Sequence, residues 1–383
     1  MLDVLVAGAG PAGAIAARQL ALCGARVVLV DRDEFPREKL CGDTLNPGAL
    51  QLLASLGLRG GALDHALPLV GMRVTGPGAS VEARYGPGRH GLSVSRRMLD
   101  QWLLEQAIAA GVRFEPGLTV HGTLSEERAG RPTVRGLVVR NGSGKVMRLP
   151  ALVTIGADGR RSAVARSVGL GTHPSTSRRW AFGTYFGPKG SKGTEGSLGA
   201  VGEMHVRPGW YCGVAPMPGG SANVCVVTDR REGAADPLGL IRRYLASDRE
   251  LGRRFAGAEP VAPVTVLGPL AVDVSSAGVA GLFLAGDAAG FVDPITGDGL
   301  HLAMQGAVLA ASETLEVLNT GDWNGAVERL NGKRDALFGG KLRFNRMLRT
   351  LTSSPLAVRL AGLGALAAPG VVRRVIIRAG DAA

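Results

Sequence analysis

A glycine-rich turn near the N-terminus limits the fold of this chain more strongly than any other feature. It reads GAGPAG from Gly8 to Gly13, between the apolar segment 2–7, which predicts a buried strand, and residues 11–23, whose pattern predicts a helix. In such a strand–turn–helix Gly8 permits the tight turn, Gly10 lets the backbone approach a pyrophosphate, and Gly13 allows the helix to pack closely on the strand. The helix N-terminus adds unpaired amides and partial positive charge. We therefore predict a dinucleotide-binding βαβ unit.

An acid ends the second predicted strand of this unit. The segment 26–31 (RVVLVD) is apolar up to Asp31, which stands 18 residues after Gly13. A carboxylate in that place accepts hydrogen bonds from a ribose diol of the dinucleotide. Strand, turn, helix and terminal acid all occur in the required order, so the prediction rests on more than the glycine spacing.

Two later turns follow predicted strands in the same way. Gly156–Ser162 (GADGRRS) follows the apolar segment 151–155 and by itself predicts an ordinary strand-to-helix turn capped by Asp158 or Ser162.

The last turn begins with Leu284–Ala289 (LAGDAA), in which a strand delivers Asp287, whose carboxylate can bind a ribityl or ribose hydroxyl. The loop Asp293–His301 (DPITGDGLH) then starts a helix near Gly299. The N-terminus of that helix can face the N1/C2 edge of an isoalloxazine ring and stabilise the negative charge of a reduced flavin.

In this order and spacing the three motifs resemble those of the FAD-dependent enzymes built like para-hydroxybenzoate hydroxylase. That family includes aromatic hydroxylases, flavin-dependent halogenases and geranylgeranyl reductases. The resemblance covers about residues 1–315 and implies that the first site holds FAD, with NADPH or NADH as the reductant. It also implies that Asp158 and Gly159 touch the flavin side and help the nicotinamide nucleotide to approach.

The same resemblance assigns further residues to the cofactor. Pro36–Asp43 (PREKLCGD) is similar to the Lys-x-Cys-Gly segment of the geranylgeranyl reductase branch, whose Cys-Gly turn lies against the flavin. Arg97 in SRRMLD matches the family arginine that reaches the flavin phosphate or ribityl region, and Val120 stands where the main chain grips the adenine. The expected cofactor-binding residues are Gly8, Gly10, Ala12, Gly13, Asp31, Arg32, Cys41, Gly42, Arg97, Val120, Asp158, Asp287, Gly297, Gly299 and Leu300.

The stretch 209–216 (GWYCGVAP) departs from two branches of the family. Of the reductase pattern it keeps Tyr211 and Pro216, but Gly213 and Ala215 replace aromatic residues. Of the halogenase pattern it keeps the initial Gly209-Trp210, whereas Cys212 and Ala215 do not match. Neither branch is fully matched.

We therefore predict an FAD-dependent oxidoreductase, and specifically an NADH- or NADPH-dependent monooxygenase that hydroxylates or epoxidises a hydrophobic or aromatic small molecule. One alternative is a C=C reductase of an isoprenoid or lipid, which the Lys-x-Cys-Gly segment favours. Others are a flavin-dependent halogenase and, from a different class, a flavin-binding protein without activity. No pattern identifies the catalytic residues, and Cys41 and Tyr211 are the candidates.

The order of the motifs predicts two interleaved domains in an α/β fold. A Rossmann-type FAD-binding domain is expected over 1–70, 95–172 and 270–315, and a mainly antiparallel substrate domain over 71–94 and 173–269. A basic, helical C-terminal region is expected over 316–383.

Most of the net charge of +12 lies in that last region. Between residues 329 and 378 the chain has eleven Lys or Arg and one acid, Asp335. Residues 338–351 predict an amphipathic helix, which would either contact anionic lipid headgroups or cover the enzyme with its apolar side. Aromatic residues do not alternate with the basic ones, so we expect no nucleic acid partner.

The four cysteines form no CxxC pair, and the histidines show no metal-ligand spacing, so we expect no metal site. The sequence contains no apolar run of about 18 residues, so we expect no membrane-spanning helix. The N-terminus does not resemble a signal peptide, and we expect a cytoplasmic protein, membrane-associated if the basic region binds lipid.

Overall fold

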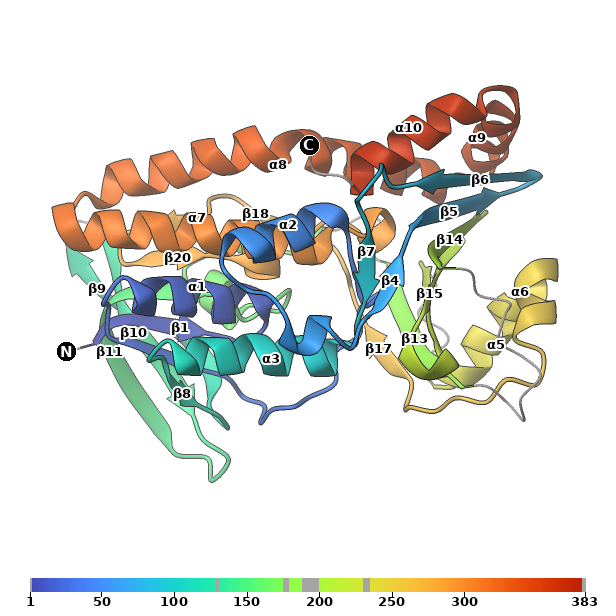
Figure 1. The fold of residues 1–383 in the computed structure, drawn as a ribbon. Coiled ribbons are helices and arrows are strands. Elements are labelled where there is room, and N and C mark those ends of the chain that lie inside the picture. Colours follow the sequence, from blue (N-terminus) through green and yellow to red (C-terminus); the bar gives the residue numbers. More distant parts are fainter. Residues whose placement is uncertain (1, 129–130, 175–178, 188–199, 230–234, 381–383) are drawn as a thin grey trace.

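Two large β-sheets organise the molecule, and the chain passes between them more than once (Figure 1). The computed structural model describes residues 2–128, 131–174, 179–187, 200–229 and 235–380. Residues 188–199, inside the stretch that we expect to be β-rich, lie outside the described residues.

The first sheet is the Rossmann-type sheet that the N-terminal motif predicts. Its strands follow the order β19-β20-β11-β1-β2-β8, and every pair along this path is parallel except β19–β20. The first half of β11 pairs with the hairpin β9–β10, and the second half pairs with β1. The strands are β1 (Leu2–Ala7), β2 (Val27–Val30), β8 (Arg113–Glu115), β9 (Thr119–Arg128), β10 (Arg131–Arg140), β11 (Val146–Gly156), β19 (Gly278–Val279) and β20 (Leu282–Leu284).

Alternate side chains of β1 supply two separate cores, one on each face of this sheet. Val4 and Val6 pack among helices on one face. Leu5 and Ala7 pack on the other face against residues of β10 and α4. A strand buried on both sides is apolar throughout, which is why residues 2–7 show no polar alternation. The helices of this part are α1 (Pro11–Leu22), α2 (Pro47–Ser55), α3 (Arg96–Ala109), α4 (Ala163–Ser167) and α7 (Gly299–Thr320), with single 3₁₀ turns at Gly61–Leu63, Gly286–Ala289 and Pro294–Thr296.

The second sheet is mainly antiparallel, as expected for a substrate domain. Its order is β17-β13-β16-β15-β14-β5-β6, in which only β14–β5 is parallel. Two helices, α5 and α6, cover one face, and a three-stranded sheet, β3-β7-β4, is the third sheet of the fold. The bounds are β3 (Thr44–Leu45), β4 (Leu67–Leu69), β5 (Gly71–Gly76), β6 (Ala79–Arg84), β7 (Gly91–Ser93), β13 (Trp180–Phe186), β14 (Val201–Arg207), β15 (Trp210–Pro216), β16 (Ala222–Thr228), β17 (Thr265–Leu267), α5 (Pro237–Ser247) and α6 (Arg249–Arg254), with a short pair β12 (Gly171–Thr172) and β18 (Asp273–Val274) and a 3₁₀ turn at Pro218–Gly220.

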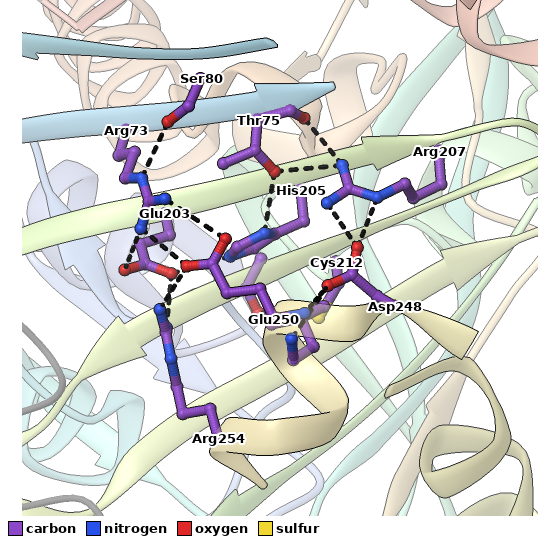
Figure 2. A network of polar contacts seen from close by, with 12 residues as sticks. Arg73, Thr75, Ser80, Glu203, His205, Arg207, Cys212, Asp248, Glu250 and Arg254 are labelled. Carbon is purple, nitrogen blue, oxygen red and sulfur yellow. Dashed lines mark hydrogen bonds and ion pairs between the residues drawn. The ribbon is translucent and has the colours of Figure 1, made fainter. Parts of the chain in front are cut away.

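A buried polar network joins this sheet to α6 (Figure 2). The ring of His205 is fully buried, and its nitrogens lie 2.9 Å from the Thr75 hydroxyl and 2.7 Å from the Glu203 carboxylate. Arg254 of α6 donates to the same carboxylate at 2.6 Å. Buried charges are tolerated when they are paired in this way, so the network holds α6 against β14.

The C-terminal region is helical, as predicted, and lies along one side of the molecule (Figure 1). α8 (Trp323–Ser353) contacts α7, while α9 (Pro355–Ala367) and α10 (Pro369–Gly380) cover β5 and β6. Among the described residues, no single helix is long and apolar enough to cross a membrane. Together, α9 and α10 reach the required length and apolar composition, but the two helices are bent by 107° relative to each other. The predicted α/β fold class, with two sheets and a helical C-terminus, is confirmed.

Candidate functional site

The structure brings the three sequence motifs together at the ends of β1, β11 and β20. A Cβ atom on Gly8 would lie 2.4 Å from the Ala157 carbonyl oxygen, and one on Gly13 would lie 1.8 Å from the Gly8 oxygen. A Cβ atom on Gly286 would lie 2.9 Å from that of Ala12. At these three positions only glycine fits, since real Cβ atoms do not come within 3.0 Å of other heavy atoms. The motifs therefore form one site.

Two helices open their N-termini at this site without a side-chain cap. The N-cap of α1 is Gly10, and the N-cap of α7 is Asp298, whose side chain does not cap the helix. Asp298 instead accepts a hydrogen bond from Asn46 at 2.8 Å and lies 3.4 Å from Lys341 of α8. In the other helices with a described N-cap, a Ser, Asp or Asn side chain accepts from a first-turn amide. The uncapped amides of α1 and α7 are thus available to phosphate and flavin oxygens.

Basic side chains gather at the same turn. The position of a Cβ atom on Gly10 lies 3.6 Å from Arg37 and 3.9 Å from Arg96. Burial lowers the pKa of Lys39 to about 8, and the neighbouring charges of Arg96 and Arg37 add to this effect. Both arginines contact the buried Asp100, at 2.7 and 3.1 Å, but one carboxylate does not balance three cations. The excess positive charge is costly to bury, so it indicates an anionic ligand. The pyrophosphate of FAD has the required charge.

Arg96 occupies the place that the sequence resemblance assigned to Arg97. Arg96 is buried on the inner side of α3 and makes two contacts of 2.7 Å with the fully buried Asp100. Arg97 points outward, where it lies 3.7 Å from Glu38 with half of its side chain exposed. The structure thus brings Arg96, and not Arg97, to the glycine turn, and contact of either with the cofactor stays a prediction. One residue along a helix is a rotation of about 100°, enough to exchange the inner and outer sides.

The acids of the first and third motifs behave differently. Asp31 is buried and accepts from the amides of Ala9 at 2.7 Å and Asp33 at 3.0 Å, so it holds the glycine turn in place. Asp287 is partly exposed, with its carboxylate 3.9 Å from Arg160. Burial raises the pKa of Asp287, and Arg160 opposes the rise. Asp287 is thus free to accept hydroxyl groups of a ligand in the way that the sequence predicts.

A surface depression lies beside the end of β2, where the adenosine end of the dinucleotide is expected. Arg32 is exposed at this depression. Val120 lies next to it on β9, paired with Val139. The other residues lining the depression are Glu34, Pro116, Gly117, Leu118, Thr119, Arg140, Asn141, Gly142 and Gly144.

Asp158 has the structural role that its motif alone predicts. Its carboxylate accepts from the amides of Ala163 at 2.7 Å and Val164 at 3.3 Å at the start of α4. Ser162 caps the same helix. Burial raises the pKa of Asp158. Contact of Asp158 and Gly159 with a flavin stays a prediction.

The Cys41–Asp43 turn joins the cofactor side of the molecule to the second sheet. Asn223 of β16 donates to the Cys41 carbonyl at 3.0 Å and to the Asp43 carboxylate at 2.7 Å, and Tyr185 of β13 donates to the same carboxylate. Asp43 is fully buried with a φ of +54°, a strained conformation for a residue with a side chain. Its Oδ1 has no hydrogen-bond partner among the described residues. Gly42, between them, is exposed.

Burial governs the protonation of this turn. It raises the pKa of Asp43 to about 6, although the hydrogen bonds from Tyr185 and Asn223 oppose the rise. It also raises the pKa of the Cys41 thiol, so Cys41 is a neutral thiol and not a thiolate nucleophile. Of the groups here, Asp43 is the one that can hold or release a proton near neutral pH.

The second catalytic candidate, Tyr211, lies inside the core. Its side chain is almost fully buried, and its hydroxyl donates to Asp293. Asp293 also lies 3.2 Å from Arg179, which donates to Thr352 of α8 at 2.7 Å. Burial raises the pKa of Tyr211 well above its usual range. These contacts connect β15, the loop before α7 and the C-terminal helix, which is a structural role.

The remaining predicted positions lie at the start of α7. Gly297 has a φ of +72°, which glycine adopts without strain. Gly299 begins the helix, and Leu300 is buried in the same core as α1.

Sequence reasoning missed Arg96, Asp43 and their partners. The spacing of α3 held a usable signal, because Arg96 and Asp100 share the helical stripe of Leu99, Leu103 and Ala107, all of them buried. No comparable local signal marks Tyr185 and Asn223, which reach Asp43 from 142 and 180 residues away.

The comparisons with known proteins agree with this site. The family model described as an FAD binding domain matches residues 1–325. The menaquinone reductase of Mycolicibacterium smegmatis is 32% identical over 381 residues, covering 95% of this chain and 90% of that protein. The digeranylgeranylglycerophospholipid reductase of Methanosarcina acetivorans is 31% identical over 325 residues, covering 84% of this chain and 76% of that protein.

Solved structures share the fold over nearly the whole chain. The flavin-dependent brominase Bmp2 has a TM-score of 0.81 at 20% identity, covering 99% of this chain and 93% of that chain. A geranylgeranyl bacteriochlorophyll reductase-like protein from Thermoplasma acidophilum has a TM-score of 0.77 at 22% identity, covering 93% and 89%. These structures show the shared fold. The family match over residues 1–325 and the two reductase relatives show that the chain belongs to the FAD binding domain family and is an FAD-dependent oxidoreductase of the para-hydroxybenzoate hydroxylase-like superfamily.

Proposed function

We propose that the protein reduces C=C bonds in the isoprenoid chain of a lipid, with NADPH or NADH as the source of electrons. The observation that carries this proposal is the buried carboxyl of Asp43 next to Cys41, in the turn that resembles the reductase branch. The likeness to a menaquinone reductase over 95% of this chain supports it. Because that relative is named for the reduction of menaquinone, we choose a prenylated quinone as the test substrate.

Bound FAD, reduced by a nicotinamide nucleotide, supplies the hydride for such a reaction. Saturation of the double bond then requires a proton at its second carbon. Asp43 is suited to deliver that proton from Oδ1, which has no hydrogen-bond partner among the described residues, while Tyr185 and Asn223 hold Oδ2 in place. Its pKa of about 6 keeps a useful fraction of the carboxyl protonated near neutral pH.

The chain's own residues would also hold the cofactor. Arg96, Arg37 and the amides of α1 are placed to bind the pyrophosphate, and Asp287 is placed to bind hydroxyl groups of the ribityl chain. The thiol of Cys41 remains neutral and contributes packing beside the reacting group.

Anaerobic incubation with NADPH and a prenylated quinone, followed by mass spectrometry, tests the proposal. We expect a product with two more hydrogen atoms for each reduced bond. Asp43→Asn should keep its FAD and lose most of this turnover, whereas Asp64→Asn, at an exposed acid, should behave as the unmodified protein. A protein that oxidises NADPH but leaves the C=C bonds of the quinone unchanged would contradict the reductase assignment.

The monooxygenase that the sequence favours is the second candidate. The observation in its favour is the pair Gly213 and Ala215, where the reductase pattern has aromatic residues; a Cβ atom on Gly213 would have only Met204 nearby, at 3.8 Å. The same assay separates the two, because a monooxygenase forms product only with O₂ and incorporates one oxygen atom. A protein that binds FAD without oxidising NADPH or NADH under either condition would be a non-catalytic flavin binder.

A further inference from the structure

Helix α9 is apolar on every side, which is unusual for a helix at the surface of a protein. Its thirteen residues (PLAVRLAGLGALA) include one charged side chain, Arg359. A helix that is apolar all round is normally enclosed, either in a core or in a lipid phase. The structure encloses only one side of α9.

The inner side of α9 is fully used in covering the second sheet. Val358 and Gly362 are buried there, and a Cβ atom on Gly362 would lie 2.5 Å from the Pro77 carbonyl oxygen at the β5–β6 turn. On α10, Ile376 packs against Val81 of β6 in the same way. The inner faces therefore account for the docking of both helices, and Leu356, Leu360 and Leu363 lie outside this core.

The outer side carries large apolar residues that are open to solvent. Leu356, Leu360 and Leu363 are 67%, 56% and 62% exposed, at a spacing that places them in one stripe. On α10, Val371 and Val375 are 52% and 39% exposed. Figure 1 shows both helices at the edge of the molecule, above β5 and β6. We call these outer surfaces, with Leu366 and the cations Arg359, Arg374 and Arg378, the α9–α10 face.

The charge that α9 and α10 themselves carry has a single sign. From residue 355 to residue 380 the chain contains no Asp or Glu and four Arg. On α10, Arg374 and Arg378 fall on the same helical side as Val371 and Val375, because these positions are three or four residues apart. Apolar side chains flanked by arginines match the boundary between acyl chains and anionic headgroups.

We propose that the α9–α10 face docks the enzyme on an anionic lipid bilayer, with the leucines of α9 at the level of the acyl chains and the arginines among the headgroups. A second copy of the chain is the less suitable occupant. A two-fold contact between two such faces would set arginines against arginines, whereas anionic lipid neutralises them. The proposal rests on the surface itself; only the further step, that the lipid-dissolved substrate is drawn from this bilayer, rests on the proposed function.

Co-sedimentation of the full FAD-loaded protein with vesicles tests the proposal without any substrate. Mixed phosphatidylcholine–phosphatidylglycerol vesicles should bind the protein at low salt and pure phosphatidylcholine vesicles should bind it much less. Binding should weaken at high salt, since the screening length falls to about 3 Å at 1 M.

Two variants of the face and one matched control make the test specific. Leu360→Glu with Leu363→Glu should lower the partition coefficient on the order of tenfold or more. Leu22→Glu should leave it unchanged, because Leu22 is 57% exposed on α1, which lies in the part of the molecule away from α9 and α10 (Figure 1). Arg374→Gln with Arg378→Gln should remove the preference for anionic vesicles. Unchanged FAD content and melting temperature show that each variant is folded.

Absence of binding to anionic vesicles at low salt, or an equal loss in the Leu22→Glu control, would overturn the proposal. A second outcome would also overturn it: the protein does not bind vesicles but forms a dimer in sedimentation velocity, and the Leu360→Glu, Leu363→Glu variant abolishes that dimer. Turnover measured in detergent micelles separates this outcome from the proposed function, because a reductase that fails to bind vesicles would still reduce a micellar substrate.

Discussion

Two adjacent arginines on α3 allow a sharp test of the cofactor site. Arg96→Gln and Arg97→Gln remove the same charge and the same volume, one on the inner side of the helix and one on the outer side. Arg96 pairs with Asp100, which is fully buried, and the only other cation on that carboxylate among the described residues is Arg37 at 3.1 Å. Loss of one partner of a buried pair costs about 3–5 kcal/mol, and we expect the lower end because Arg37 remains.

The outer arginine should matter far less to stability. Arg97 and Glu38 are 51% and 53% exposed and their charged atoms are 3.7 Å apart. Exposed pairs of this kind contribute about 0–1 kcal/mol. Urea unfolding of the two apoproteins at neutral pH therefore should differ by about 2–3 kcal/mol between the variants.

FAD binding gives an independent measurement on the same pair. A charge-assisted hydrogen bond to phosphate contributes about 1.5–3 kcal/mol, which corresponds to roughly a 10- to 100-fold rise in the Kd of FAD for Arg96→Gln. Titration of each apoprotein with FAD, followed by the quenching of flavin fluorescence, measures this. Equal Kd values for the two variants, or a weaker FAD complex in Arg97→Gln, would refute the inward assignment of Arg96.

Three further predictions concern single side chains. Asp287→Ala should lose most bound FAD, read from the ratio of flavin to protein absorbance, whereas Asp273→Ala, at an exposed acid, should retain it; normal occupancy in Asp287→Ala would count against the ribityl contact. Cys41→Ser should keep FAD but change turnover or the flavin potential, and a variant identical to the unmodified protein in both would contradict a place beside the ring. Glu203→Gln should cost about 3 kcal/mol at pH 7, the lower end for a broken buried pair, because Arg254 loses the Glu203 carboxylate but keeps Glu250 at 2.9 Å (Figure 2). Burial raises the pKa of Glu203, but the hydrogen bonds from His205 and Arg254 outweigh this and lower it. The stability from Glu203 is therefore present above the unfolded pKa of about 4.3 and is lost as the pH falls through the folded value, so the difference between the two proteins in urea unfolding should shrink below about pH 4.

The sequence by itself determined the cofactor domain. Gly8 has a φ of +94°, which the tight turn requires, and Gly13 lies against the Gly8 oxygen five residues earlier. The apolar run of β1 follows from burial on both faces, so the βαβ unit can be predicted from local pattern. The order of the three motifs was sufficient for FAD and for the fold class. Such features depend on short stretches of chain, and the same residues specify them in any context.

Only the tertiary structure decided what each polar side chain does. Whether Arg96 or Arg97 faces the site depends on the rotation of α3 against its neighbours, and Asp43 gains its raised pKa from burial under strands that come more than 140 residues later. The basic C-terminus left two alternatives open in the sequence, and packing shows that the helices cover the enzyme with one side while α9 exposes leucines on the other. Burial and long-range contact arise from the folded arrangement of distant segments, and for that reason no local pattern contains them.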